Sequence, residues 1–360
     1  MKSSVTLYGF RRYVLLGLFL PFLSKFAYAE KLEVFSTSET PINGVAITSK
    51  GRVFYSMPQW LEPSQPSPSV VERKKDGSLL PYPGGKWNKF SKSDPENRFV
   101  NVNAVHFDGN DGLWVVDYGA PFFGPTLENS QKLVKINVET DKVEKVYRFP
   151  SLLEGKAKLN DVRVDLSRGL AYLSEFGAGS IIVLDLESGL ARKVLDQHYS
   201  TRAHPDVVSY FLGQPFKTHM LQVNDIELSP DGSRLFYQAT GGPIMYSIET
   251  AALRNSTLSD RELGERVEVF AKSTTVGGVT RDSVGNMYLG DVQKNAVTKL
   301  DLQGQMSTVV QDDRLLWPDA MTIHEGYLYV PCPQIRLLGK FHGGKSQAKM
   351  PFSVYRYKLD

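Results

Sequence analysis

Five polar residues stand at the same place in a repeated segment of this 360-residue chain, where a short apolar strand begins before a turn. They are Asn43, Asn103, Asn160, Asn224 and Asp319, and the glycine pair Gly277 and Gly278 takes this place in one further copy. Amide and carboxylate oxygens brought together would hydrogen-bond a polar ligand or hold a hard cation such as calcium. Alternatively, each residue caps its own turn by bonding to the local backbone. The sequence leaves these three interpretations open.

The repeated segment is clearest at residues 223–242, VNDIELSPDGSRLFYQATGG. Apolar residues alternate up to Leu228, a Ser-Pro-Asp-Gly turn follows, and a second aromatic and apolar strand returns, so the pattern predicts a β-hairpin. Five further copies occur at residues 43–57, 102–119, 159–177, 277–292 and 318–331. Copies spaced roughly 40 to 65 residues apart, with chain for four strands in each, are typical of a β-propeller. We therefore predict an all-β, six-bladed β-propeller that forms one domain over residues 30–360.

The innermost strands of a propeller surround a central channel, so the repeated polar position should lie at one mouth of that channel. We predict a ligand site there that includes Asn43, Asn103, Asn160 and Asn224. Strands predicted at both ends of the domain, Leu32 to Ser36 and Phe352 to Leu359, should share one blade. Such pairing would close the ring and remove open sheet edges.

The segment from Asp196 to Met220 breaks the repeat, because about 25 residues without a clear strand separate two hairpins, and loops of that length are usually functional or disordered. It holds three of the six histidines and four aromatic residues: His198, His204, His219, Tyr199, Tyr210, Phe211 and Phe216. The histidine spacings do not match a compact zinc motif, so we assign no metal-ligating residue. We predict a lid that stacks on a flat ligand, with His204 and Tyr210 as ligand-binding residues.

Residues 1–29 have the composition of a signal peptide, with a basic start, an apolar run and an Ala-Tyr-Ala cleavage site before Glu30. Arg11 and Arg12 resemble the twin-arginine export signal, and general secretion is the alternative. We expect an exported protein, periplasmic or extracellular, that is not held in a membrane. The leader contains four basic and no acidic residues, so 38 of the 42 Lys and Arg would remain against 39 Asp and Glu. No basic patch then argues for nucleic acid, and we expect a monomer whose partner is a small molecule.

Several common signatures are missing from the sequence: the Gly-x-Ser-x-Gly elbow, the phosphate-binding loop, the His-Glu-x-x-His helix and the Cys-x-x-Cys pair. The single cysteine, Cys332, cannot form an internal disulfide and is predicted to be a small buried apolar side chain. The second strands of three hairpins end in an acidic residue, Asp117, Glu175 or Asp291, whereas the fourth repeat has Gln238 instead. The pattern offers no reason for that exception.

The succession of motifs resembles the yellow and major royal jelly protein family from about Val34 to the C-terminus. The resemblance rests on GLWVVDYG (112–119), KLVKINVETDKVEKVYRFP (132–150), LNDVRVDLSRGLAYLSE (159–175), IIVLDLESG (181–189), ELSPDGSRLFYQATGGPIMYSIETAAL (227–253) and VVQDDRLLWPDAMTIHEGYLYV (309–330). It implies a secreted six-bladed propeller with a small ligand in its channel, an aromatic amine in some members. It also suggests a bacterial member related to L-dopachrome tautomerase. The family has no agreed catalytic residues, so none is transferred.

A more distant resemblance is to the gluconolactonase and senescence-marker propellers, through LNDVRVD and VNDIELSPDG. Asn160 and Asn224 match asparagines on the substrate and metal side of that group. The group also takes a Glu from its first blade and an Asp from its fifth, where this chain has Asn43 and the glycine pair. Metal-dependent lactone hydrolysis needs such a charged shell. We therefore place lactone hydrolysis second and expect no cofactor, with calcium as the alternative.

Isomerisation of a dopachrome-like substrate would need a base that removes a carbon-bound proton and donors that stabilise the enolate. If this chain is such an isomerase, the candidate bases are Asp161, Asp225 and Asp319. The candidate donors are the amides of Asn160 and Asn224. The sequence does not identify the substrate.

Overall fold

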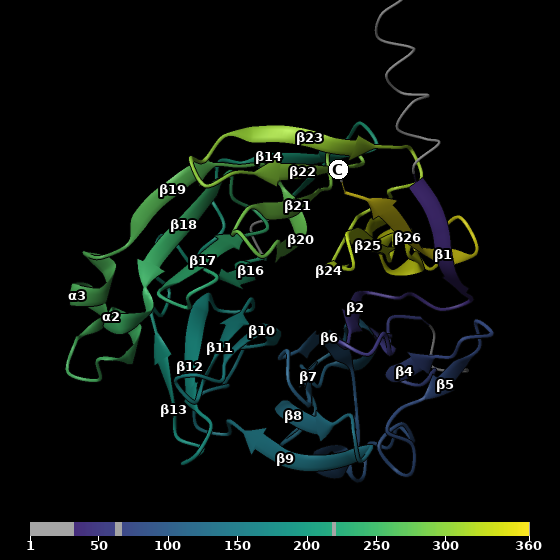
Figure 1. Cartoon of the computed structure of the whole chain (residues 1–360), viewed down its shortest axis with the longest axis horizontal. Coiled ribbons are helices and arrows are strands. Elements are labelled where there is room, and N and C mark those ends of the chain that lie inside the picture. The colour runs from purple at the N-terminus through teal and green to yellow at the C-terminus, as the bar shows by residue number, and fades with distance from the viewer. Residues whose placement is uncertain (1–31, 62–66, 218–220, 360) are drawn as a thin grey trace, which may run out of the picture.

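The computed structural model describes residues 32–61, 67–217 and 221–359. Within these ranges, six four-stranded antiparallel sheets stand around a common axis, which confirms the six-bladed propeller (Figure 1). The predicted hairpins form the two inner strands of each blade. The innermost strands β2, β6, β10, β16, β20 and β24 surround the channel.

The strands of the first three blades are β2 (Gly44–Ile47), β3 (Val53–Ser56), β4 (Val70–Arg73), β5 (Leu79–Pro81), β6 (Val102–Phe107), β7 (Gly112–Asp117), β8 (Lys132–Asn137), β9 (Lys142–Arg148), β10 (Leu159–Asp165), β11 (Leu170–Glu175), β12 (Ser180–Asp185) and β13 (Ala191–Val194). The other three contain β16 (Val223–Leu228), β17 (Arg234–Ala239), β18 (Ile244–Glu249), β19 (Glu268–Lys272), β20 (Val276–Arg281), β21 (Met287–Asp291), β22 (Ala296–Leu300), β23 (Met306–Gln311), β24 (Thr322–His324), β25 (Tyr327–Cys332), β26 (Phe352–Lys358) and β1 (Leu32–Ser38). Short helical segments are α2 (Thr250–Arg254), α3 (Asp260–Gly264), η1 (Pro95–Asn97), η2 (Pro121–Phe123), η3 (Ile335–Leu337) and η4 (Gly339–Phe341). No helix in the described ranges has the length and apolar character needed to cross a membrane.

Strands from both ends of the described chain complete the sixth blade, as predicted. β1 pairs antiparallel with β26, and the partners run from Leu32 with Tyr357 to Ser38 with Phe352. Leu32 and Tyr357 are also buried in one apolar cluster with side chains of blade 5. The first and last strands therefore hold the ring closed through a shared sheet.

The apolar core lies between the blades and not on the axis. Alternate residues of a strand face opposite sides of its sheet, so each blade contributes one face to each neighbour. On β7, Leu113 and Val115 join a cluster with blade 1, while Trp114 and Val116 join a cluster with blade 3. Comparable clusters connect the other adjacent blades. Because these contacts stabilise the ring, the channel is left to polar side chains.

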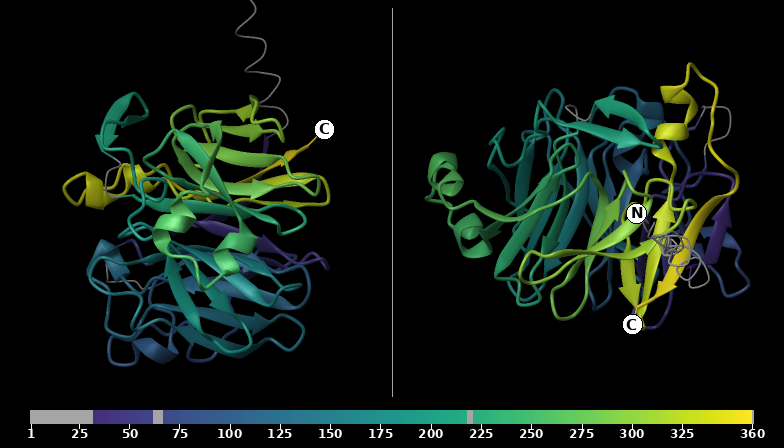
Figure 2. Two further views of the ribbon diagram at one scale, coloured as in Figure 1. Left: turned by 90° about the vertical axis from the view of Figure 1, so that its left-hand side faces the viewer. Right: turned by 90° about the horizontal axis from the view of Figure 1, so that it is seen from above.

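The segment between blades 3 and 4 differs from the prediction, because it contains a two-stranded hairpin. The strands are β14 (Val208–Phe211) and β15 (Gln214–Lys217), joined by Leu212 and Gly213, both at positive φ. Such two-residue turns suit hairpins because their twist matches that of the strands. The strands are only four residues long, and Pro215 argues against a strand in the sequence. The hairpin lies at one end of the ring, as does the segment with η3 and η4 (Figure 2).

Candidate functional site

Three of the repeated asparagines lie on β-bulges at the start of the inner strands, and Asn43 directly precedes β2. The register between the two inner strands shifts at Asn103, at Asn160 and Asn224, and at the glycine pair of blade 5. A bulge adds one unpaired residue to a strand and redirects its side chain. It therefore lets Asn103 and Asn160 reach across to the next blade.

The asparagine side chains form a chain of hydrogen bonds from blade to blade. Asn43 Nδ2 donates to the backbone oxygen of Asn103 at 3.1 Å, and Asn160 Nδ2 donates to the backbone oxygen of Asn224 at 3.0 Å. Between them, Asn103 Nδ2 donates to Asn160 Oδ1 at 2.6 Å and to its backbone oxygen at 3.3 Å. The four residues thus lie around the channel at equivalent positions, as predicted. The amides of Asn43, Asn103 and Asn160 bind the neighbouring blade and not, as the capping alternative holds, their own turn.

The Asn160→Ala variant is expected to lose about 1–2 kcal/mol of unfolding free energy, because it removes hydrogen bonds to two neighbouring blades. Urea denaturation without any ligand measures this loss. The control is Asn110→Ala in an exposed turn of blade 2, which should leave the midpoint almost unchanged. Equal midpoints for the two variants would contradict a structural role for the ring.

The three candidate bases are all buried: Asp225 and Asp319 lie at this end of the channel, and Asp161 lines the channel cavity further along. Burial raises the pKa of Asp319 to about 8, against smaller lowering effects of hydrogen bonds from Ala320, Trp317 and Asn43. Burial, followed by repulsion from Asp319 and Asp161, raises the pKa of Asp225 well above its ordinary value. Burial also raises the pKa of Asp161, although Arg163 opposes the shift. The structure therefore brings the three carboxyls into one electrostatically coupled group.

Two polar atoms in this group are buried without a hydrogen-bond partner among the described residues, Asp225 Oδ2 and Asn43 Oδ1. Leaving such atoms unpaired costs about 1–3 kcal/mol each. A polar ligand at this end of the channel would satisfy them.

The residues do not fit a bound calcium ion. Within the described ranges, no three His, Cys, Asp or Glu side chains are arranged to hold a metal. A carboxyl with the raised pKa of Asp319 is protonated at neutral pH and is a poor calcium ligand. In blade 5 a side chain is excluded, because a Cβ at Gly278 would lie 2.4 Å from the Asp319 backbone carbon. The close approach of blades 5 and 6 therefore requires the glycine where the lactonase-type propellers have a carboxylate.

Trp317 is a site residue that the sequence analysis missed. Its Nε1 donates to Asp319 Oδ2 at 3.2 Å, and its backbone has φ of +63°, a rare value for a bulky residue. Phe211 and Phe216 of the β14–β15 hairpin contact the indole ring at centroid distances of 5.8 and 5.6 Å. The hairpin thus covers the residue that holds the Asp319 carboxyl. The sequence signal that could have identified Trp317 is its place directly before Pro318 and Asp319.

An arc of aromatic side chains continues from Trp317 around this end of the ring. Arg336 lies over the rings of Phe216 and Phe341, and Phe341 contacts Phe123. Phe123 stacks on Trp60, whose Nε1 donates to Tyr118 Oη at 2.9 Å, and Tyr118 contacts Phe176. We name this set the aromatic canopy: Trp60, Tyr118, Phe123, Phe176, Phe211, Phe216, Trp317 and Phe341. It surrounds the asparagine end with flat apolar surfaces.

His204 and Tyr210 form hydrogen bonds away from the asparagine ring. His204 Nε2 is 3.3 Å from Tyr246 Oη on β18, and the Tyr210 backbone N–H bonds to Gln293 Oε1 at 2.9 Å. The Tyr210 side chain is half exposed. The structure therefore does not place His204 and Tyr210 beside the carboxyls. The β14–β15 hairpin contacts the site through Phe211 and Phe216, which pack against Trp317.

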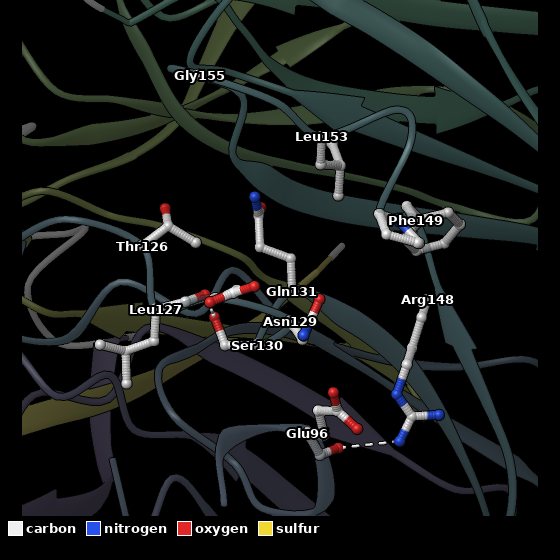
Figure 3. Close-up of a pocket in the computed structure, with 12 residues that line it drawn as sticks. Glu96, Thr126, Leu127, Asn129, Ser130, Gln131, Arg148, Phe149, Leu153 and Gly155 are labelled. Carbon is white, nitrogen blue, oxygen red and sulfur yellow. Dashed lines mark hydrogen bonds between the residues drawn. The ribbon is translucent and has the colours of Figure 1, made fainter. Parts of the chain in front are cut away.

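A cavity of about 550 Å³ lies outside the channel, beside blades 2 and 3 (Figure 3). Two of its polar side chains already have partners: Gln131 bonds to Ala157 O and Leu159 N, and Arg148 bonds to Glu96 O. None of the predicted site residues lines it. The channel remains the candidate site.

A family model described as "Major royal jelly protein" matches residues 100–349. No curated protein matches the chain. Among solved structures, the chain is similar to a putative gluconolactonase, with 12% identity, a TM-score of 0.56 and coverage of 92% of each chain. The calcium-binding protein regucalcin from Agrobacterium tumefaciens has 14% identity and a TM-score of 0.54, with coverage of 91% and 94%. Virginiamycin B lyase from Staphylococcus aureus has 12% identity and a TM-score of 0.51, with coverage of 92% and 99%. At these identities the solved structures support the fold alone.

Proposed function

Because the chain belongs to the major royal jelly protein family, we propose that it binds a small aromatic, polar ligand at the asparagine end of the channel and isomerises it by proton transfer. The observation that carries the proposal is the Asp319 carboxyl, buried with a pKa of about 8 beside Asp225. The aromatic canopy supplies flat surfaces on which a ring can stack. Asp225 Oδ2 supplies an unpaired polar atom.

Tautomerisation moves a proton from carbon to another atom of the same molecule. A base with a pKa near the working pH can both remove that proton and return it. Asp319 has this property, and Trp317 orients its carboxyl. Asp225, whose pKa burial raises well above its ordinary value, would donate a hydrogen bond from its protonated form to the enolate oxygen that forms. The Asn160 amide is already used between blades, so Asn224 is the better amide donor.

The Asp319→Asn variant is expected to bind catecholic or indolic compounds but to turn over dopachrome about 10²–10⁴-fold more slowly. Thermal shift measures binding, and the loss of dopachrome absorbance above a heat-killed control measures turnover. Parent activity should rise with pH and level off above about 8, because only ionised Asp319 accepts a proton. Asp313→Asn, at an exposed position, is the matched control. Full turnover by Asp319→Asn would exclude this base, whereas absence of ligand binding by the parent protein would refute the site.

Metal-dependent lactone hydrolysis is the alternative function, and the shared fold is what favours it. Its charged metal shell is incomplete here, since blade 1 supplies Asn43 and blade 5 supplies glycine. Metal analysis of the purified protein separates the two functions. A stoichiometric cation together with lactone turnover that a chelator abolishes would support the hydrolase.

We also propose that the protein is exported through the leader at residues 1–29, which lies outside the described residues. Expression of the full chain in a bacterial host should give a periplasmic or secreted protein beginning at Glu30. Mass spectrometry of the intact protein tests this cleavage. A cytoplasmic product that keeps residues 1–29 would contradict it.

A further inference from the structure

The channel contains a second polar region at the end opposite the asparagines. A cavity of about 260 Å³ lies there, lined by residues of all six innermost strands. Apart from Asp161, its charged and ionisable side chains stand three residues after the repeated position: His106, Arg163, Glu227 and Arg281. These four residues therefore also occupy one equivalent position of the repeat.

Arg163 fixes the wall of the cavity. It donates to Asp161 Oδ2 at 2.8 Å, to Glu227 Oε2 at 3.0 Å and to the backbone oxygen of Val279 at 3.0 Å. These bonds join blades 3, 4 and 5, and the side chain is almost fully buried. Arg163 therefore has little donor capacity left for a ligand.

Arg281 differs because its guanidinium is incompletely paired. Its Nε is buried without a hydrogen-bond partner among the described residues and lies 3.7 Å from Glu227 Oε1. Its Nη1 donates to the backbone oxygen of Asp282 at 3.2 Å. The side chain is 28% exposed and lines the cavity. It can thus present N–H donors to a bound molecule.

The side chains around the cavity offer several hydrogen-bond donors. Burial and then the charges of Arg163 and Arg281 lower the pKa of His106 to about 3. The imidazole is therefore neutral and keeps one N–H donor. The two facing carboxyls, Asp161 and Glu227, both accept hydrogen bonds from Arg163, and neither accepts one from Arg281 Nε. The walls around them also carry the hydroxyls of Thr280 and Thr322.

We propose that this cavity binds a small organic carboxylate, with Arg281 as the charged donor and His106 as the neutral donor. An arginine fork matches the two oxygens of a carboxylate. The volume is below that of drug-sized pockets, so the ligand is a small acid. This site is separate from the one at the asparagine end and does not require isomerase activity.

Calorimetric titration of the full chain with pyruvate and with benzoate tests the proposal, with equal ionic strength of sodium chloride as the blank. Saturable binding is expected, about tenfold or more weaker in Arg281→Gln, since a hydrogen bond to a charged group is lost. Arg266→Gln, at an exposed arginine, should bind like the parent protein. The His106 ring resonance, assigned by its loss in His106→Gln, should shift with the same dissociation constant.

Thr322→Leu provides a second test that does not remove a charge, because the larger side chain would fill the cavity. It should abolish carboxylate binding while the protein still melts cooperatively. Binding that persists in both Thr322→Leu and Arg281→Gln would overturn the proposal. So would the absence of saturable binding of either acid to the parent protein, or a His106 resonance that does not move.

Discussion

The Lys132→Ala variant is expected to be less stable than the parent protein by about 3–5 kcal/mol, because it leaves a buried carboxylate unpaired. Lys132 and Asp117 form an ion pair at 2.9 Å, and neither side chain is exposed. The ammonium group also donates to the backbone oxygens of Pro95 and Ser130, at 2.9 and 2.8 Å. The variant therefore lacks the ammonium group that balances the buried Asp117 carboxylate. It also leaves the backbone oxygens of Pro95 and Ser130 without this donor. Urea denaturation at pH 7 measures the change.

The control for this prediction is Lys50→Ala. Lys50 pairs with Glu139 at 2.7 Å, but both side chains are more than half exposed, so its loss should cost less than about 1 kcal/mol. Asp117 also accepts backbone N–H groups from Val100, Asn101 and Gly119, so it should stay ordered in the variant. Equal losses of unfolding free energy for the two lysine variants would show that the buried Lys132–Asp117 pair matters no more to stability than the exposed pair.

Asp319 is expected to make the protein less stable as the pH rises from about 5 to 8. The folded protein holds the Asp319 proton up to about pH 8, whereas the unfolded chain releases it near the ordinary value of 3.8. The stabilising contribution of this group is thus complete below pH 3.8 and is lost as the pH rises through the folded pKa. The expected slope from one such proton is about 1.4 kcal/mol of unfolding free energy per pH unit.

The measurement is the difference in unfolding free energy between the parent protein and Asp319→Asn at several pH values. Taking the difference cancels groups that titrate alike in both proteins. The unfolding free energy of the parent protein minus that of Asp319→Asn should fall by about 1.4 kcal/mol per pH unit as the pH rises. The variant therefore gains stability relative to the parent protein towards pH 8. Asp313→Asn, at the exposed control position, should give a flat difference. A flat difference for Asp319→Asn as well would mean that its pKa is not raised.

The acidic strand ends and their exception in blade 4 have a structural explanation. Glu175 accepts backbone N–H groups from Lys158, Gly177, Ala178 and Gly179, so the carboxylate orders the loops that flank the inner strands. In blade 4, Gln238 Nε2 instead donates to the backbone oxygens of Gly242 and Thr274, at 2.7 and 2.6 Å. There the loops present carbonyls and not N–H groups, which an amide can bond and a carboxylate cannot.

The segment after blade 3 shows where sequence patterns were insufficient. A hairpin with four-residue strands has too few alternating positions to stand out. Its conformation depends on contacts far along the chain, such as those of Phe211 and Phe216 with Trp317, and Ser209 Oγ with Thr275 Oγ1 at 2.7 Å. Such contacts leave no local signature.

The sequence by itself determined the architecture of this protein. The repeated hairpins, the alternation of apolar residues and the strands at both ends specify six blades and the closure by β1 and β26. These features are local, because side-chain alternation and turn residues act over a few neighbours. The positions of the ring asparagines and of the three candidate bases followed from the same repeat.

Only the tertiary structure decided what those residues do. Asn103 and Asn160 look alike in sequence, but a bulge and the next blade's carbonyl make them links between blades. Asp319 looks like a turn residue, yet burial, with a smaller effect of the Asp161 charge, raises its pKa to about 8. Likewise, Arg281 differs from Arg163 only through the partners that other blades supply. Burial and cross-blade contacts depend on residues distant in the chain, so no local pattern encodes them.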